Sequence, residues 1–186
     1  MIQTKEDLKA YIVADNSWYN PGNWKWRLIE RFTSAPNYVL KKYLRYLRTY
    51  EYHYNNAKGS RFHAYMGYFY ERKKNRLGRQ LGIEIGPNCF GKGLSIWHYG
   101  SIVINPDVRA GEYCTLRGAN CIGNNGTANR NPILGDRVSL GYGAIIIGDV
   151  SVADDTTIGA NAVVNKTISK SGCVYAGVPA KKIASR

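Results

Sequence analysis

The chain has 186 residues, with 26 Lys and Arg against 13 Asp and Glu, which gives a formal net charge of +13. This length is sufficient for one domain with an appendage and for a sizeable hydrophobic core. No apolar run approaches the roughly 18 residues that a membrane-spanning helix needs. The first residues lack the basic-then-apolar order of a secretion signal, so we expect a cytoplasmic protein.

The positive charge is concentrated in the first part of the chain. Residues 1–80 hold 16 Lys and Arg and 6 Asp and Glu, whereas residues 81–186 hold 10 and 7. Aromatic side chains interleaved with basic ones could stack on bases, but no nucleic-acid motif accompanies them, so no nucleic-acid partner is expected. The four cysteines show no CxxC pair and no Cys/His cluster spaced for zinc. We therefore expect free thiols and no metal.

Residues 1–80 are predicted to be helical. Thr4 precedes an acidic first turn, which is typical of a helix start. A second helix is expected to open at Pro36, and a third to cover residues 61–79. The second helix has one face at a spacing of about 3.6 residues, and its basic side chains on the other faces are expected to be solvated. The face positions are Leu40, Tyr43, Leu44, Leu47 and Glu51, and the basic positions are Lys41, Lys42, Arg45 and Arg48.

Residues 81–186 carry 16 of the 20 glycines and a repeat with a period of six. Aliphatic residues recur at this step without a break from Leu134 to Val164. A small or β-branched residue stands four positions after each of them. This period suits neither a helix nor a lone strand. It predicts a β-helix in which each flat side is a short strand, the aliphatic residue points inward and three sides make one coil. Gly123–Pro132 interrupts the repeat and is predicted to be a loop.

Three elements of this repeat region resemble the left-handed β-helix acyltransferases, and more specifically their serine acetyltransferase branch. They are Gly82-Ile83-Glu84-Ile85 followed by GKGLSIWHYG at 91–100, the segment Ile158–Lys166, and the tail AGVPAKKI at 176–183. The combination resembles most closely the serine-acetyltransferase-like enzymes of surface-polysaccharide synthesis. The resemblance implies an α+β chain with a helical domain at 1–80, a left-handed parallel β-helix at 81–186, and assembly as a homotrimer. Acetyl-CoA would lie along the groove between neighbouring β-helices.

The family's catalytic histidine falls on His98, and its supporting carboxylate falls on Glu84. Acetyl transfer to a hydroxyl needs a base, and histidine has a suitable pKa near neutrality. His98 is also the only histidine of residues 81–186. A carboxylate on one ring nitrogen would fix the tautomer and support the imidazolium. The alternative is a histidine that makes a structural hydrogen bond at a turn.

Two departures from serine acetyltransferase bear on the acceptor. Where that enzyme has Asp before the catalytic histidine, this chain has Trp97, and where its loop reads Arg-His-Pro, this chain reads Arg130-Asn131-Pro132. Trp97 cannot pair with an ammonium but offers an aromatic face to a sugar. We therefore predict O-acetylation of a sugar hydroxyl, with Trp97, Arg130 and Asn131 on the acceptor side.

Two alternatives to sugar acetylation stay open. One is serine O-acetylation for cysteine synthesis, and the other is a non-catalytic binding or scaffold protein. The cationic helical half adds an anionic membrane surface as a candidate partner, because such a surface attracts basic segments.

The resemblance also assigns the acetyl-CoA contacts. Small residues of successive coils offer backbone contacts, here Tyr142 and Ala160. Tyr142 departs from the usual small residue, so its ring is expected to point away. Asn165 and Lys166 correspond to a pair near the pantetheine, and Lys181 to a basic residue that faces the nucleotide phosphates. The alternative for both lysines is a solvated side chain.

Overall fold

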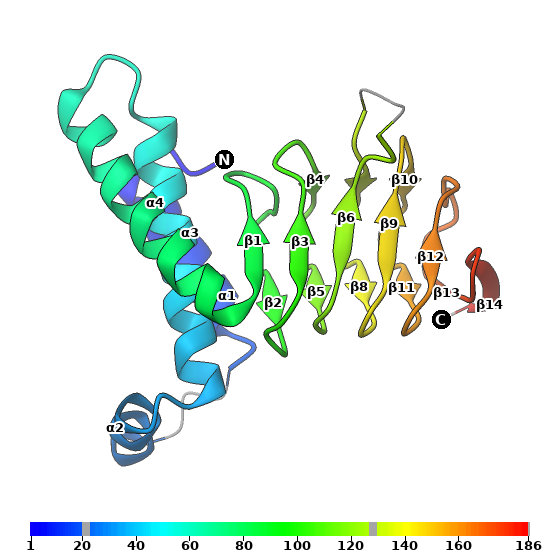
Figure 1. Ribbon diagram of the computed structural model, residues 1–186, viewed down its shortest axis with the longest axis horizontal. Helices are drawn as coiled ribbons and strands as arrows, with labels where there is room; N and C mark the ends of the chain where they lie inside the picture. Colours follow the sequence, from blue (N-terminus) through cyan, green and yellow to red (C-terminus); the bar gives the residue numbers. More distant parts are fainter. Residues whose placement is uncertain (20–22, 127–129, 186) are drawn as a thin grey trace.

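The computed structural model describes residues 1–19, 23–126 and 130–185. Helices come first within these residues, and short strands follow as a stack of coils that extends away from the helices (Figure 1). The helices are α1 (Lys5–Asn16), α2 (Trp24–Phe32), α3 (Pro36–Asn55) and α4 (Arg61–Leu81). The sequence predicts three of these starts, but it does not predict α2 as a separate helix.

Local sequence explains where the helices begin and end. The Thr4 hydroxyl accepts a hydrogen bond from the Asp7 backbone N–H, and the Asp7 carboxylate accepts one from the Thr4 N–H, so the predicted start of α1 is a capping box. Pro36 stands in the first turn of α3. Ser60 caps α4, which ends at Gly82 in the left-handed conformation with φ of 66°.

The strands form three sheets that make the three sides of a β-helix. The first sheet contains β1 (Ile83–Ile85), β3 (Ile102–Ile104), β6 (Cys121–Gly123), β9 (Ile145–Ile147) and β12 (Val163–Val164). The second contains β4 (Arg109–Ala110), β7 (Ile133–Leu134) and β10 (Ser151–Val152). The third contains β2 (Ser95–Ile96), β5 (Thr115–Leu116), β8 (Ser139–Leu140), β11 (Thr157–Ile158), β13 (Cys173–Ala176) and β14 (Lys181–Ser185). The pairs within each sheet are parallel, except that β14 runs antiparallel to β13.

The inward residues of the coils form a continuous hydrophobic column, as the repeat predicts. The aliphatic residues at the six-residue step are buried, namely Leu134, Leu140, Ile146, Val152, Ile158 and Val164. Strand register stacks them directly, because Ile146 pairs with Ile122 on one side and with Val164 on the other. Each buried aliphatic side chain contributes roughly 1.5–3 kcal/mol by leaving water, so the column stabilises the coils in series.

One coil is longer than its neighbours. Cys121 on β6 pairs with Ile145 on β9, 24 positions later, whereas Ile145 pairs with Val163, 18 positions later. The extra residues fall in Gly123–Pro132, where the sequence predicts a loop. Residues 127–129 of this segment lie outside the described residues, and residues 124–126 and 130 are exposed.

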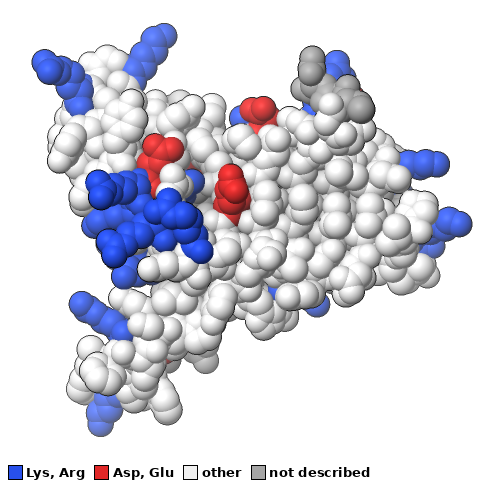
Figure 2. Space-filling view, viewed as in Figure 1, with Lys and Arg blue, Asp and Glu red and all other residues white. Residues whose placement is uncertain are grey.

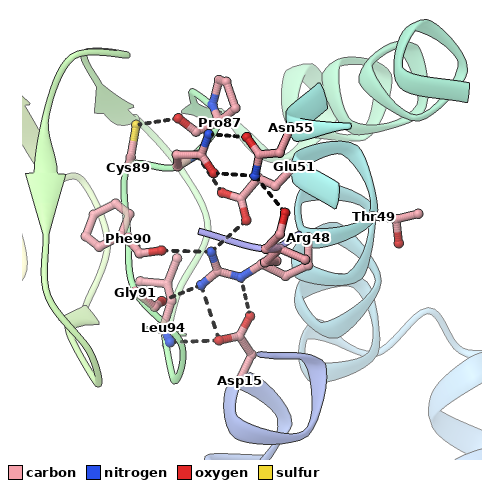
Figure 3. Close-up of polar contacts among 12 residues, drawn as sticks. Asp15, Arg48, Thr49, Glu51, Asn55, Pro87, Cys89, Phe90, Gly91 and Leu94 are labelled. Atoms are coloured by element: carbon pink, nitrogen blue, oxygen red, sulfur yellow. Dashed lines mark hydrogen bonds and ion pairs between the residues drawn. The ribbon is translucent and has the colours of Figure 1, made fainter. Parts of the chain in front are cut away.

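A buried charged cluster fixes the helices to the first coil (Figure 3). Arg48, which the sequence places on a solvated face, is fully buried, so that prediction is wrong. Its guanidinium donates to the carboxylates of Asp15 and Glu51 at 2.8 and 2.9 Å, and to the backbone carbonyls of Phe90 and Gly91 at 3.0 and 2.7 Å. Glu51 is on the same helix, but Asp15 lies on α1 and Phe90 and Gly91 lie in the β-helix, so helical periodicity cannot detect this role.

The two carboxylates of this cluster also hold the segment that leads into β2. Asp15 accepts hydrogen bonds from the backbone N–H groups of Gly93 and Leu94, and Glu51 accepts one from Asn88. Burial by itself lowers the pKa of the Arg48 guanidinium, but the charges of Glu51 and Asp15 outweigh it and raise the pKa above the ordinary value. Arg48 therefore stays charged, and its buried charge is compensated by the carboxylates of Asp15 and Glu51.

Candidate active site

The turns between strands line up along edges of the β-helix (Figure 1). Two of these edges lie on either side of the first sheet. The turns that lead from the third sheet into the first form what we call the His98 edge, at residues 97–101, 117–120, 141–144 and 159–162. The turns that leave the first sheet form the Arg130 edge, at residues 105–108, 124–126, 130–132, 148–150 and 165–167.

A groove of about 390 Å³ lies along the His98 edge. Trp97 and His98 come from the first coil, Arg117 from the second, Tyr142 from the third and Ala160 from the fourth. The groove therefore crosses four coils parallel to the axis of the β-helix. A long, narrow ligand fits this shape better than a compact one.

Arg117 is a groove residue that the sequence reasoning missed. Its guanidinium lies over the Trp97 ring, 4.6 Å from the ring centroid, and Trp97 is 48% exposed. The Nε atom of Arg117 is buried without a hydrogen-bond partner among the described residues. A buried donor without a partner is unfavourable, so a ligand that brings an acceptor oxygen would be stabilised here.

The Tyr142 ring lines the groove, which corrects the prediction that it points away. It packs over Gly118, where an added Cβ would come within 3.0 Å of the ring and 3.2 Å of the His98 Cβ. Gly118 has φ of 112°, a conformation that side chains rarely adopt. The absence of a side chain at Gly118 therefore leaves room for the Tyr142 ring beside His98.

Glu84 lies outside the groove. It is exposed on β1 and borders a separate pocket of about 440 Å³, together with Asn75 and Arg79 of α4 and Ser101. No hydrogen bond or ion pair of the described residues joins Glu84 to His98. The predicted pair is therefore not formed in this single chain, although Ser101 ends the turn that carries His98.

Of the three predicted acceptor residues, Trp97 lines the groove, whereas Arg130 and Asn131 lie on the Arg130 edge. Arg130 is exposed, and its guanidinium lies 3.8 Å from the Asp149 carboxylate. Asn131 is half-buried, and its Oδ1 has no partner among the described residues. Because the first sheet separates the two edges, one chain does not bring these side chains to His98.

The predicted acetyl-CoA residues divide in the same way. Ala160 lines the groove, where it stacks so closely on Gly141 that an added Cβ there would lie 2.5 Å from the Ala160 nitrogen. Asn165 and Lys166 follow β12 on the Arg130 edge and are exposed. Lys181 opens β14 and is exposed outside the groove.

The described residues form no metal-binding cluster, and the thiols of Cys89 and Cys114 are buried. No group of three or more His, Cys, Asp or Glu side chains within residues 1–19, 23–126 and 130–185 could hold a metal ion. Burial raises the pKa of the Cys89 thiol to about 11 and that of Cys114 to about 12, so both are poor nucleophiles near neutrality. None of the described helices is long and apolar enough to cross a membrane.

Several solved structures of serine acetyltransferases have the same architecture. The soybean apoenzyme superposes with a TM-score of 0.72 over 96% of this chain and 69% of its own, at 21% identity. The enzyme from Brucella abortus strain S19 in complex with coenzyme A gives 0.68 over 97% of this chain and 67% of its own, at 24% identity. These neighbours combine an N-terminal helical region with a left-handed β-helix. The fold is thus that of the hexapeptide-repeat acyltransferases, the class that the sequence resembles.

Sequence comparison narrows the class to a family. The serine acetyltransferase of Helicobacter pylori strain J99 is 38% identical over 120 residues, which are 62% of this chain and 70% of that protein. No family model matches the chain. The chain belongs to the serine acetyltransferase family and is an acetyl-CoA-dependent acyltransferase. The relatives do not support the narrower resemblance to enzymes of surface-polysaccharide synthesis.

Proposed function

We propose that the chain transfers the acetyl group of acetyl-CoA to an acceptor hydroxyl, with His98 as the general base. The observation that carries the proposal is the position of His98 in a groove that crosses four coils. His98 takes the hydroxyl proton while the acceptor oxygen attacks the thioester carbonyl. The carbon–sulfur bond then breaks, and the imidazolium returns its proton to the departing thiolate of CoA. Acetyl ester and free CoA are the products.

The groove fits acetyl-CoA as the donor. An extended ligand matches its length across the coils, and the small residues at Gly159 and Ala160 let a chain approach the backbone. Arg117 offers a cation and an unpaired N–H to an anionic or carbonyl oxygen. Lys166 and Lys181 remain the proposed contacts to the pantetheine and the phosphates.

Free serine is the first candidate acceptor. It is supported by the relatives, which are named serine acetyltransferases. The sequence alone ranks a sugar hydroxyl ahead of serine, and the relatives reverse that ranking. A sugar hydroxyl is the second candidate, and one observation favours it. The groove holds the half-exposed Trp97 ring and no acidic side chain among its described lining residues, so it offers stacking and no carboxylate for an ammonium.

We also propose that the groove is completed by a second copy of the chain in a homotrimer. The support is the division of the proposed residues between the two edges of the first sheet. In a threefold ring each interface is heterologous, which means that two different surfaces meet. The His98 edge of one copy can therefore meet the Arg130 edge of the next copy. Arg130, Asn131 and Lys166 of one copy would then face His98 of its neighbour. A cytoplasmic location remains a prediction.

The acceptor is tested by CoA release from acetyl-CoA with serine or with a panel of free hexoses and N-acetylhexosamines. We expect turnover of serine that His98→Ala abolishes. Trp97→Ala separates the candidates, because serine is too small to stack on the ring. It should lower kcat/KM by about tenfold for a sugar and by less than about twofold for serine. If no acceptor releases CoA and calorimetry detects no acetyl-CoA binding, the chain is a non-catalytic scaffold and the proposal fails.

A further inference from the structure

Helix α2 carries a large apolar surface that no other described part of the chain covers. None of its residues is buried, and Trp24 and Phe32 are 66% and 92% exposed. Its exposed apolar side chains are Trp24, Trp26, Leu28, Ile29 and Phe32. Single exposed apolar residues are common on protein surfaces, but several large ones on one short helix indicate an interaction surface.

The contact between α2 and α3 determines which face is free. The Glu30 carboxylate accepts a hydrogen bond from the Lys41 ammonium at 3.2 Å, so this side of α2 faces α3. Trp24, Leu28 and Phe32 follow one another at four-residue spacing and lie on the opposite side. The α2 face formed by these three residues therefore points away from the protein.

Basic side chains border this face. Lys25, Arg27 and Arg31 are all exposed, and the Lys25 ammonium lies 5.8 Å from the centroid of the Trp24 ring. Glu30, the one acid of α2, is neutralised by its ion pair. Figure 2 shows the corresponding lobe as mostly uncharged surface with Lys and Arg at its margins. A helix with tryptophan, leucine and phenylalanine beside Lys and Arg suits the interface of an anionic bilayer.

Two hydrogen bonds hold the segment that follows α1, before α2 in the chain, against the coil that carries His98. The Trp18 indole N–H donates to the Gly93 carbonyl at 2.9 Å, and the Tyr19 hydroxyl donates to the Ile96 carbonyl at 2.8 Å. Ile96 ends β2, two residues before His98. In Figure 1, α2 and the turns of the His98 edge lie toward the same lower side. A surface that binds α2 would thus lie on the side of the molecule toward which these turns point.

We propose that α2 docks the protein on an anionic membrane surface. Trp24, Leu28 and Phe32 enter the interfacial region, and the flanking Lys25 and Arg31 contact lipid phosphates. A second copy of α2 is the competing occupant, but it would bring like charges together around the apolar face, which disfavours that contact. The proposal does not depend on which hydroxyl is acetylated.

The test is co-sedimentation of the full chain with lipid vesicles. We expect binding to vesicles of phosphatidylcholine mixed in equal parts with phosphatidylglycerol, and much weaker binding to phosphatidylcholine alone. Trp24→Ala with Phe32→Ala should reduce the partition coefficient by roughly tenfold or more, because interfacial binding scales with buried apolar area. Lys25→Gln with Arg31→Gln should do the same, because each cation near an anionic surface contributes to attraction.

A matched control removes aromatic side chains from another helix. Phe62→Ala with Tyr65→Ala on α4 deletes two rings that are also well exposed, and vesicle binding should stay within about twofold of the wild type. CoA release in solution should be unchanged in the α2 variants. The proposal is overturned if the wild type ignores anionic vesicles or if the α2 variants bind like the wild type. A fall in oligomeric mass of the α2 variants by light scattering also overturns it, since a second copy would then cover this face.

Discussion

The two edges that flank the first sheet carry different halves of the proposed chemistry. The His98 edge holds a histidine, a cation with an unpaired N–H and two aromatic rings in one groove. The Arg130 edge holds the exposed basic side chains of Arg130 and Lys166. Neither of these residues lines the groove. Because the sheet between the edges is a rigid stack of coils, one chain cannot fold them together. This difference supports our proposal that each chain carries two half-sites that meet between copies.

Removing the base from the His98 edge should have the largest effect. His98→Ala is expected to lower kcat by about 10²–10⁴, because a positioned general base contributes a factor of this size. Binding of acetyl-CoA, measured by calorimetry, should change little. The control is His63→Ala on α4, which leaves the groove intact and should keep near-normal turnover. Near-normal CoA release by His98→Ala would contradict the assignment.

Arg48 holds the first coil of the His98 edge, so its removal should be the next largest effect. Arg48→Met leaves the buried carboxylates of Asp15 and Glu51 without their cation and should lower the free energy of unfolding by about 3–5 kcal/mol. Arg45→Met on the exposed side of the same helix should stay within about 0.5 kcal/mol. Denaturant unfolding measures both, and equal losses would show that the cluster has no special role.

The Arg130 edge is tested by mixing subunits. Arg130→Ala with Asn131→Ala should lower kcat/KM for the acceptor by roughly tenfold, the effect of losing a charge-assisted hydrogen bond. Refolding this variant together with His98→Ala should then restore about a quarter of wild-type activity, because that share of interfaces in a threefold ring joins two intact edges. Activity that equals the average of the separate variants would mean that each chain uses only its own edges.

The smallest expected effect lies far from both edges, at the contact between α3 and α4. The Nδ1 atoms of His53 and His63 are 3.0 Å apart, and burial, followed by the charge of His63, lowers the pKa of His53 below 6.5. The unfolded chain then binds more protons than the folded one as pH falls through 6.5. The melting temperature should therefore drop between about pH 8 and about pH 5. His53→Gln should flatten this slope, and an unchanged slope would assign it to other groups.

Periodicity predicted the coils well because a six-residue repeat fixes which side chains point inward. The strand register also places Arg117 beside Trp97, a position that we did not predict from the sequence. Leu116 pairs with Ile96, so the residue after it occupies the turn position next to Trp97. Tyr142 could not be oriented in this way, since the direction of its ring depends on the space above Gly118. Helix α2 was missed because its apolar residues have no partner in the described chain.

The sequence by itself determined the β-helix, the start of three helices and the position of the loop. Each of these is local or periodic, so neighbouring residues are enough to specify it. The tertiary structure decided that Arg48 is buried, that Glu84 and His98 border different pockets, and that the predicted contacts divide between two edges. These properties depend on which distant segments come together, because burial and pairing of a polar group are set by the partners that surround it.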